Sequence, residues 1–464
     1  MVIENTTPER IEELVLQQRA FFASGVTRDI DWRRYQLKQF EEGLKKWEKP
    51  LCDALWTDLH KSYEEAYLTE IGLVYGEIRE ARRKVGRWAR RRRKPTPLTV
   101  MPSSSYIVRE PLGCTLIVSP WNYPVQLLLN PLVGAIAAGC TAILKPSPYV
   151  PNVSKVLEEF IADTFVDNFV AVVQGNRDVN TELFKQRYDL VFLTGSPSLA
   201  KVAVAAQAKY LTPMVLELGG KSPCIITADA DLKLAARRLA WGKALNAGQT
   251  CIAPDYVLID RKIRDAFVDE YFRQLHALLG EDPQETEHFV RLVNDAAFER
   301  VASYISGPEV SGTVRGGRTD PATRYIEPTV VLDPAPDSPV MTTEIFGPVL
   351  PVCSYDSLDE AVAFVNGREK PLALYFFGKL SDGKSVVRRT SSGGACINDT
   401  IMHIVNEKVP FGGVGNSGMG HYHGKLSFDA FTHERALIIT PRRIDLPFRY
   451  MPYKLYKLFR LILG

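Results

Sequence analysis

The stretch that decides the fold runs from residue 111 to residue 145 and reads PLGCTLIVSPWNYPVQLLLNPLVGAIAAGCTAILK. A short apolar run, Cys114 to Ser119, is followed by a helical apolar pattern from Pro124 to Ala138 and by a second short run from Thr141 to Leu144. Short apolar runs that alternate with helices indicate β-α-β units, whose strands lie parallel in one sheet. Polar residues and a proline interrupt the apolar part from Val125 to Leu144, which predicts a buried helix and strand and not a membrane span.

The alternation continues along most of the chain. Further elements are expected over Val153 to Asp163, Phe169 to Val173, Leu190 to Thr194 and Ser196 to Ala208. A second series follows Glu217, over Cys224 to Thr227, Leu232 to Leu245 and Tyr256 to Ile259. We therefore expect an α/β fold with two parallel-sheet domains. On the N-terminal side, helical spacing from Pro8 to about Lys94 predicts a helical region, and Thr99 to Glu110 predicts a strand or hairpin.

Composition agrees with a large globular protein. A length of 464 residues corresponds to about three domains at ~150 residues each. The 45% hydrophobic and 24% charged residues exclude a disordered, collagenous or coiled-coil chain. Lysine and arginine exceed aspartate and glutamate by 57 − 54 = 3, so the overall charge does not indicate a nucleic-acid-binding protein.

The cysteines indicate a reducing compartment. There are 7 of them, an odd number scattered over a long chain, and no C-x-x-C pair occurs. This pattern is not that of a disulfide framework or of a structural zinc site, so we expect no metal. The first ten residues contain no apolar signal segment, and we expect a cytoplasmic protein.

Cys251 is the candidate nucleophile. It ends the segment Asn246-Ala247-Gly248-Gln249-Thr250-Cys251, whose small residues allow a substrate to approach. Gly248 is expected to bring the backbone near a ligand, and the Cys251 amide at a turn is suited to bind an oxyanion. The alternative is a buried structural cysteine.

Two further residues suit the same chemistry. Glu217 lies between apolar residues and the pair Gly219-Gly220, where poor solvation raises a carboxyl pKa and makes a general base; a capping or salt-bridged glutamate is the alternative. Asn122 follows the strand ending at Val118 and is flanked by prolines, which makes its amide a rigid donor for an oxyanion. The alternative for Asn122 is an ordinary turn asparagine.

A site for phosphate and ribose is indicated by two turns. At the first turn, a strand ends in Gly195, Ser196 caps a helix, and Pro197 opens it, which leaves amides that attract anions. This is not the G-x-G-x-x-G fingerprint, and such turns are common. At the second turn, Lys145 supplies a cation for ribose hydroxyls, or is a surface lysine.

Together these segments resemble the aldehyde dehydrogenase superfamily, class 3 type, from about Tyr35 to Arg435. The likeness is carried by segments in the family's order, which are the stretch Pro120 to Pro124, LKPS from Leu144, LTGS from Leu193, LELGGKSP from Leu216, GQTC from Gly248, EIFGP from Glu344 and PFGGVGNSG from Pro410. The resemblance implies oxidation of aromatic or medium- to long-chain aliphatic aldehydes to carboxylic acids with NAD or NADP.

The resemblance also implies residue roles. Cys251 is the attacking thiolate, Asn122 forms the oxyanion hole with the Cys251 amide, and Glu217 is the base that completes thioester hydrolysis. Because an ordinary thiol with a pKa of ~8.5 is only a few per cent thiolate at pH 7, the site has either to lower that pKa or to generate thiolate on demand. The implied cofactor-binding residues are Trp121, Lys145, Gly195, Ser196, Leu218, Glu344 and Phe346, with Glu344 on the nicotinamide ribose, Phe346 at the nicotinamide and Lys145 on the adenosine ribose.

The family likeness implies a domain organisation as well. A Rossmann-like dinucleotide-binding domain is expected over residues 1–96 and 111–215, and a catalytic domain over residues 216–420. Residues 97–110 and 421–445 are expected to form a small β arm that joins two copies in a homodimer, with an aldehyde as the small-molecule partner. Residues 446–464 form a tail.

One residue departs from the pattern of NAD-preferring members. Pro148 stands where many of them have a glutamate that holds the adenosine ribose and repels a 2′-phosphate. The departure predicts that NADP is accepted alongside NAD.

Two basic segments indicate other classes of function. The run from Arg82 to Lys94 either contacts nucleic acid or is a solvated helix face paired with acidic residues; we expect the second, because no nucleic-acid-binding motif accompanies it. The tail has apolar residues at helical spacing from Leu455 to Leu463, with Lys454, Lys457 and Arg460 opposite. It either touches an anionic membrane surface peripherally, or packs on the dimer partner or the substrate entrance, where Tyr450 and Tyr453 are candidates. Cofactor-free acyl transfer by Cys251 is the alternative within enzymes.

Overall fold

The deciding stretch forms a parallel β-α-β unit. The structure is a computed structural model that describes residues 3–308, 310–445, 450–453 and 455–463. Strand β3 (Cys114–Val118) is followed by helix α5 (Gln126–Ala138) and strand β4 (Thr141–Lys145), and β3 and β4 pair in parallel. Every residue of α5 is buried. The expected buried helix and strand are therefore confirmed, and no described helix is long and apolar enough to cross a bilayer.

The first body is built on a six-stranded sheet in the order β17-β7-β6-β3-β4-β5. Its other strands are β5 (Val170–Val172), β6 (Leu190–Gly195), β7 (Met214–Leu218) and β17 (Gly418–Met419), of which only β17 runs antiparallel. The helices of this body are α1 (Pro8–Ala23), α2 (Ile30–Leu59), α3 (Tyr63–Ala66), α4 (Gly72–Trp88), α6 (Pro151–Thr164), α7 (Arg177–Lys185) and α8 (Pro197–Gln207). The expected boundary after residue 215 falls inside β7, because Glu217 is paired within this sheet.

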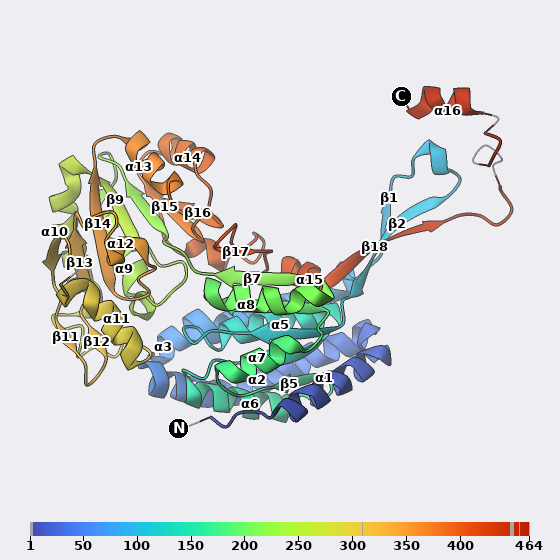
Figure 1. Ribbon diagram of the computed structural model, residues 1–464, viewed down its shortest axis with the longest axis horizontal. Helices are drawn as coiled ribbons and strands as arrows, with labels where there is room; N and C mark the ends of the chain where they lie inside the picture. Colours follow the sequence, from blue (N-terminus) through green and yellow to red (C-terminus); the bar gives the residue numbers. More distant parts are fainter. Residues whose placement is uncertain (1–2, 309, 446–449, 454, 464) are drawn as a thin grey trace.

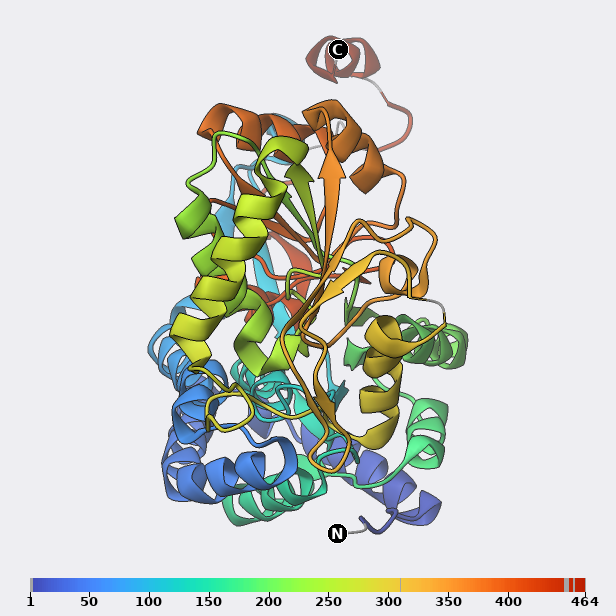
Figure 2. The ribbon, with the colours of Figure 1, turned by 90° about the vertical axis from the view of Figure 1, so that its left-hand side faces the viewer.

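The second body, coloured from light green to orange in Figure 2, is built on a seven-stranded sheet in the order β10-β13-β14-β9-β8-β15-β16. These strands are β8 (Pro223–Ile226), β9 (Tyr256–Asp260), β10 (Thr313–Arg315), β13 (Thr329–Leu332), β14 (Val349–Tyr355), β15 (Ala373–Phe377) and β16 (Gly394–Ile397). Its helices include α9 (Leu232–Ala244), α10 (Arg264–Leu279), α11 (Asp295–Ser306), α12 (Pro339–Thr342), α13 (Leu358–Asn366) and α14 (Leu380–Arg389). A short hairpin joins β11 (Thr319–Asp320) to β12 (Tyr325–Ile326). The α/β fold with parallel sheets is confirmed.

A three-stranded antiparallel arm projects from the first body (Figure 1). Strand β2 (Ser104–Pro111) lies between β1 (Arg92–Lys94) and β18 (Thr432–Ile439). The prediction of a helix to about Lys94 is wrong at its end, because α4 stops at Trp88. A helix would stack the arginines of this run on one another at i,i+3 and i,i+4, whereas β1 spreads them and lets Arg92 pair with Glu434 at 2.7 Å.

The second expected arm segment, residues 421–445, begins too early. Helix α15 (Lys425–Ala430) packs against α5, so the chain from residue 421 to residue 431 lies on the first body, and the arm strand starts at Thr432. In the tail, residues 446–449, 454 and 464 lie outside the described residues. The remaining part forms helix α16 (Tyr456–Leu463), which lies beyond the arm in Figure 1.

Candidate active site

Two adjoining cavities lie where strands of both sheets end. The larger encloses about 790 Å³ and the smaller about 500 Å³, and they share Pro120, Trp121 and the segment 194–196. In the first sheet the chain order reverses between β3 and β6, and the crevice beyond the carboxyl ends of strands at such a point is where α/β proteins bind ligands. The larger cavity is bordered by nine of the predicted site residues, Trp121, Asn122, Gly195, Ser196, Glu217, Leu218, Cys251, Glu344 and Phe346, and the smaller one by the tenth, Lys145.

Cys251 lies in a turn between a short 3-10 segment (Leu245–Gly248) and β9. Gly248 has φ +72°, and a Cβ there would collide with the carbonyl oxygen of Gly347. The left-handed backbone and the close approach of the Gly347 carbonyl therefore both require a glycine at this position. Burial, followed by repulsion from Glu344 and then Glu217, raises the pKa of the Cys251 thiol to about 12.

Glu217 lies near the carboxyl end of β7 and is 3% exposed. Neither carboxylate oxygen has a hydrogen-bond partner among the described residues. Burial without a partner raises the pKa of this carboxyl well above its usual value, as its apolar neighbours predicted. Such a group takes up a proton readily, and the residue borders the larger cavity.

Asn122 is fixed against the loop that carries Cys251. Its side-chain Nδ2 donates to the Gln249 carbonyl oxygen at 3.0 Å, which leaves its second N–H for a ligand. Asn246 Nδ2 donates both to that carbonyl, at 2.9 Å, and to the carbonyl oxygen of Asn122, at 3.0 Å. Next to them, the Tyr123 and Thr250 hydroxyls lie 2.6 Å apart. These contacts make one unit of the loop after β3 and the loop before β9.

Glu344 and Phe346 stand on a segment that sequence reasoning did not explain. Lys221 pairs with Asp255 and donates to the Thr343 carbonyl at 2.8 Å, while Asp255 accepts the Ile345 N–H at 3.0 Å. This buried tie holds the backbone on both sides of Glu344. The only sequence signal was Lys221 itself, which follows the double glycine, and Asp255 gave none.

The aromatic and carboxyl groups of this segment face the cavity. The rings of Trp121 and Phe346 meet edge to face, with centroids 5.3 Å apart. Burial is the main cause that raises the pKa of Glu344 to about 8. Arg300, which also borders the cavity and was not predicted, donates to the Glu344 carbonyl oxygen at 3.3 Å.

The opposite end of the cavities has the predicted capped helix. Ser196 caps α8, with its Oγ accepting the Leu199 N–H at 3.3 Å, and Pro197 is the first helical residue. Lys145 is 1% exposed and donates to the Pro146 carbonyl at 2.7 Å, so it is not a surface lysine. Burial lowers the Lys145 pKa to about 7.

The smaller cavity is suited to an anion. No aspartate or glutamate is among the residues that border it, whereas Lys145 and Arg177 do border it, as does Pro148. Arg177 begins α7, where the helix dipole adds positive potential.

The model of the aldehyde dehydrogenase family matches residues 2–437 of the chain. The chain belongs to this family. It is 43% identical over 445 residues to the 4,4'-diaponeurosporen-aldehyde dehydrogenase of Staphylococcus aureus (strain NCTC 8325 / PS 47), covering 96% of this chain and 97% of that one. It is also 43% identical to a dimeric NADP-preferring aldehyde dehydrogenase of Canis lupus familiaris, covering 96% and 98%.

A solved structure agrees with this membership. The substrate-bound state of AldH from Staphylococcus aureus matches with a TM-score of 0.96 and 41% identity, over 98% of this chain and 99% of that one. This aldehyde dehydrogenase oxidises aldehydes to carboxylic acids and uses NAD or NADP. The resemblance read from the sequence motifs is thereby confirmed.

Proposed function

We propose that Cys251 attacks the aldehyde carbon as a thiolate and forms a thiohemiacetal. The second N–H of Asn122 and the backbone N–H of Cys251 bind the resulting oxyanion, since both groups border the larger cavity and are tied together through Gln249. The observation that carries the proposal is this convergence of Cys251, Asn122 and Glu217 on one cavity. Fixed donors at the oxygen stabilise charge as it develops, without reorganisation of the site.

Glu217 acts after oxidation, when a thioester joins the acyl group to Cys251. A water between Glu217 and the thioester loses its proton to the carboxylate and attacks the carbonyl carbon, which releases the acid and the Cys251 thiol. The two unpartnered oxygens of Glu217 support this role, because a base must reach the water directly.

The cofactor lies along the first body and reaches the segment of the second body that carries Glu344 and Phe346. Ser196 at the start of α8 binds the pyrophosphate, Lys145 the adenosine ribose and Glu344 the nicotinamide ribose, while Trp121, Leu218 and Phe346 contact the nicotinamide end. The capped helix and the two joined cavities fit a long, doubly charged ligand. When bound, the cofactor supplies the acceptor for a hydride.

The substrate is an apolar aldehyde, with a medium or long aliphatic chain or an aromatic ring. Cys251 packs against the main buried apolar cluster, which includes Ile252, Ile401 and Phe411. An S. aureus relative is named for the aldehyde of diaponeurosporene. We test this with NAD or NADP reduction over aldehydes from two to sixteen carbons and benzaldehydes. Equal kcat/KM for acetaldehyde and for the long and aromatic members would contradict the assignment.

NADP is accepted alongside NAD. We expect Pro148→Glu to weaken binding of 2′,5′-ADP about tenfold or more and to leave 5′-AMP binding unchanged, because a new carboxylate repels the 2′-phosphate. Calorimetric titration measures both, and Tyr149→Phe serves as a control on a neighbouring position. A catalytic efficiency with NADP a thousandfold or more below that with NAD would overturn the prediction.

Two copies of the chain form a homodimer through the arm. Both long strands of the arm lie away from the body, and β18 leaves one edge without a strand partner among the described residues. Exposed apolar side chains at the arm include Leu98, Val100, Ile438 and Ile439. A molar mass by light scattering of twice that of one chain would support the dimer. The mass of a single chain at micromolar concentration would contradict it.

The tail contacts an anionic membrane surface peripherally in a cytoplasmic protein. Exposed Lys457 and Arg460 of α16 supply charge, and Leu461 is 82% exposed. We expect the full chain to sediment with vesicles containing phosphatidylglycerol, less so at high salt, and a chain ending at Pro452 to stay in solution. Vesicles of neutral lipid are the control. Equal behaviour of both chains on anionic vesicles leaves packing on the partner as the role of the tail.

A further inference from the structure

A completely buried ion pair lies beneath the loop that carries Asn122. Lys61 Nζ and Glu70 Oε1 are 2.6 Å apart, and both side chains are 0% exposed. Lys61 follows the end of α2, and Glu70 lies in a π-helical turn, Tyr67–Ile71, that precedes α4. Removing two charges from water offsets most of their attraction, so such a pair adds little net stability. What the pair contacts is therefore more informative than the pair itself.

Glu70 holds the start of α5. Its second carboxylate oxygen accepts the N–H of Val125 at 2.7 Å and that of Gln126 at 3.3 Å. The first N–H groups of a helix have no partner within the helix, and a buried helix start needs an acceptor from elsewhere. The carboxylate supplies it at the positive end of the helix dipole. The start of α5 is therefore tied to the π-helical turn.

Lys61 holds the other end of the same short segment. Its Nζ donates to the carbonyl oxygen of Asn122 at 3.0 Å and lies 4.4 Å from the centre of the Tyr123 ring. The pair thus binds residues 122–126 at both ends, with the cation at Asn122 and the anion at Val125 and Gln126. Asn122, the proposed oxyanion donor, is the first residue of this segment.

The carbonyl of Asn122 is also the meeting point with the nucleophile loop. Asn246 Nδ2 donates to it, and Asn246 itself has φ +51°, a conformation unfavourable for a residue with a side chain. The Asn246 N–H is held by Glu65 Oε1 at 2.9 Å. Lys61 and Asn246 therefore fix one oxygen from two sides, and a shift of this oxygen changes where the Asn122 amide points.

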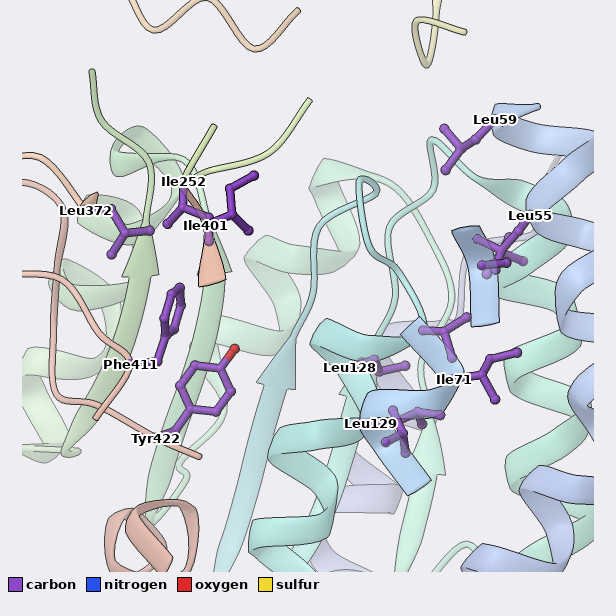
Figure 3. Close-up of a cluster of buried hydrophobic side chains, with 14 of the residues drawn as sticks. Leu55, Leu59, Ile71, Leu128, Leu129, Ile252, Leu372, Ile401, Phe411 and Tyr422 are labelled. Atoms are coloured by element: carbon purple, nitrogen blue, oxygen red, sulfur yellow. The ribbon is translucent and has the colours of Figure 1, made fainter. Parts of the chain in front are cut away.

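Apolar contacts hold the surrounding helices independently of the ion pair. Leu55 and Leu59 of α2, Ile71 of the π-helical turn and Leu128 and Leu129 of α5 are completely buried in one cluster, shown in Figure 3. These contacts maintain the packing of the helices. The position of the loop that carries Asn122 is then set by the ion pair. The π-helical turn that contains Glu70 agrees with such a role, because π-helical turns often occur at functional sites.

We propose that Lys61 and Glu70 are positioning residues that place the Asn122 amide for oxyanion binding. Neither residue borders the two cavities, and both act on the chemical step through Asn122. The inference rests on the proposed role of Asn122. It predicts a loss in kcat without a loss in cofactor affinity.

The test replaces both charges, because a single replacement leaves the other charge buried and unpaired. For Lys61→Met/Glu70→Gln we expect kcat to fall about 10- to 100-fold, less than or equal to the loss of a whole oxyanion donor. The Kd for NADP, measured by fluorescence, and the thermal midpoint are expected to stay near those of the unchanged protein. Glu41→Gln is the matched control, since Glu41 ties α2 to α4 through Arg79 and Arg82 and touches nothing at the site.

A mutant cycle with Asn122→Ala tests the role of Asn122 separately from the positioning role of Lys61 and Glu70. If the pair acts through Asn122, replacing it in the Asn122→Ala background lowers kcat by less than about twofold more. Full activity of Asn122→Ala overturns the proposed role of Asn122. The positioning role is overturned if Asn122→Ala loses activity while Lys61→Met/Glu70→Gln keeps full activity. It is also overturned if the two losses in kcat multiply in the combined variant. If Lys61→Met/Glu70→Gln does not fold, Lys61→Arg replaces it in the mutant cycle, because arginine keeps the charge and displaces the donor atom.

Discussion

Replacement of Cys251 by alanine is expected to abolish aldehyde-dependent reduction of NAD and NADP, by at least about 10⁴-fold in kcat. The reason is that Cys251 is the only cysteine among the residues that border the larger cavity, and only a thiolate forms the thioester. The alanine lacks the atom that binds the acyl group, and no rearrangement of Asn122 or Glu217 restores it. The change removes one sulfur atom and is expected to leave the cavity and its cofactor contacts intact.

The measurement is absorbance of the reduced cofactor at saturating aldehyde, with the Kd for NADP determined on the same sample. Cys396→Ser is the matched control, because Cys396 is also half-buried but does not border either cavity. Residual activity within a hundredfold of the unchanged enzyme would contradict the role of Cys251. Hydrolysis of an ester by the unchanged protein without nucleotide, together with no cofactor reduction, would support the alternative of cofactor-free acyl transfer.

Replacement of Glu217 by glutamine is expected to separate the two halves of the reaction. Oxidation still proceeds once, so we expect a burst of about one reduced cofactor per chain followed by turnover ~10²- to 10⁴-fold slower, the usual contribution of a general base. Rapid-mixing absorbance resolves the burst, and mass spectrometry detects the acyl group on Cys251. A variant that loses the burst as well shows that Glu217 is needed before the thioester, and one that keeps full turnover shows that it is not the base.

The pH dependence of turnover follows from the same carboxyl. Burial raises the pKa of Glu217, so the group is protonated over a wider range of pH than an exposed glutamate, and only its deprotonated form accepts a proton from water. Turnover is therefore expected to rise with pH through the Glu217 pKa, and the rise is expected to disappear in Glu217→Gln. Glu407→Gln is the control, because burial also raises the Glu407 pKa but the group borders neither cavity.

Much of the site was predictable because its residues follow strands. Asn122, Gly195 and Glu217 stand at or just beyond the ends of β3, β6 and β7, and neighbouring parallel strands bring such ends together. The alternation of apolar runs and helical patterns was therefore enough to expect one crevice. The capped helix at Ser196 was predictable for a similar reason, since a cap is a local feature.

The supporting contacts were not predictable in this way. Lys61 and Glu70 lie more than fifty positions before Asn122, in a region whose helical pattern gave no reason to place charges inside. Lys221 and Asp255 are likewise brought together only by the packing of the second sheet. Strand β1 was missed because its arginines follow a helical pattern and Glu434, the ion-pair partner of Arg92, comes from the far end of the chain.

The high pKa of the Cys251 thiol has a consequence for the enzyme between turnovers. Burial, with repulsion from Glu344 and Glu217, keeps the Cys251 thiol protonated at neutral pH. Peroxides and alkylating agents react with thiolates and hardly at all with thiols, so the raised pKa is expected to slow the reaction of Cys251 with both. We therefore expect an enzyme whose substrates are themselves reactive electrophiles to lose less of its nucleophile to side reactions between turnovers.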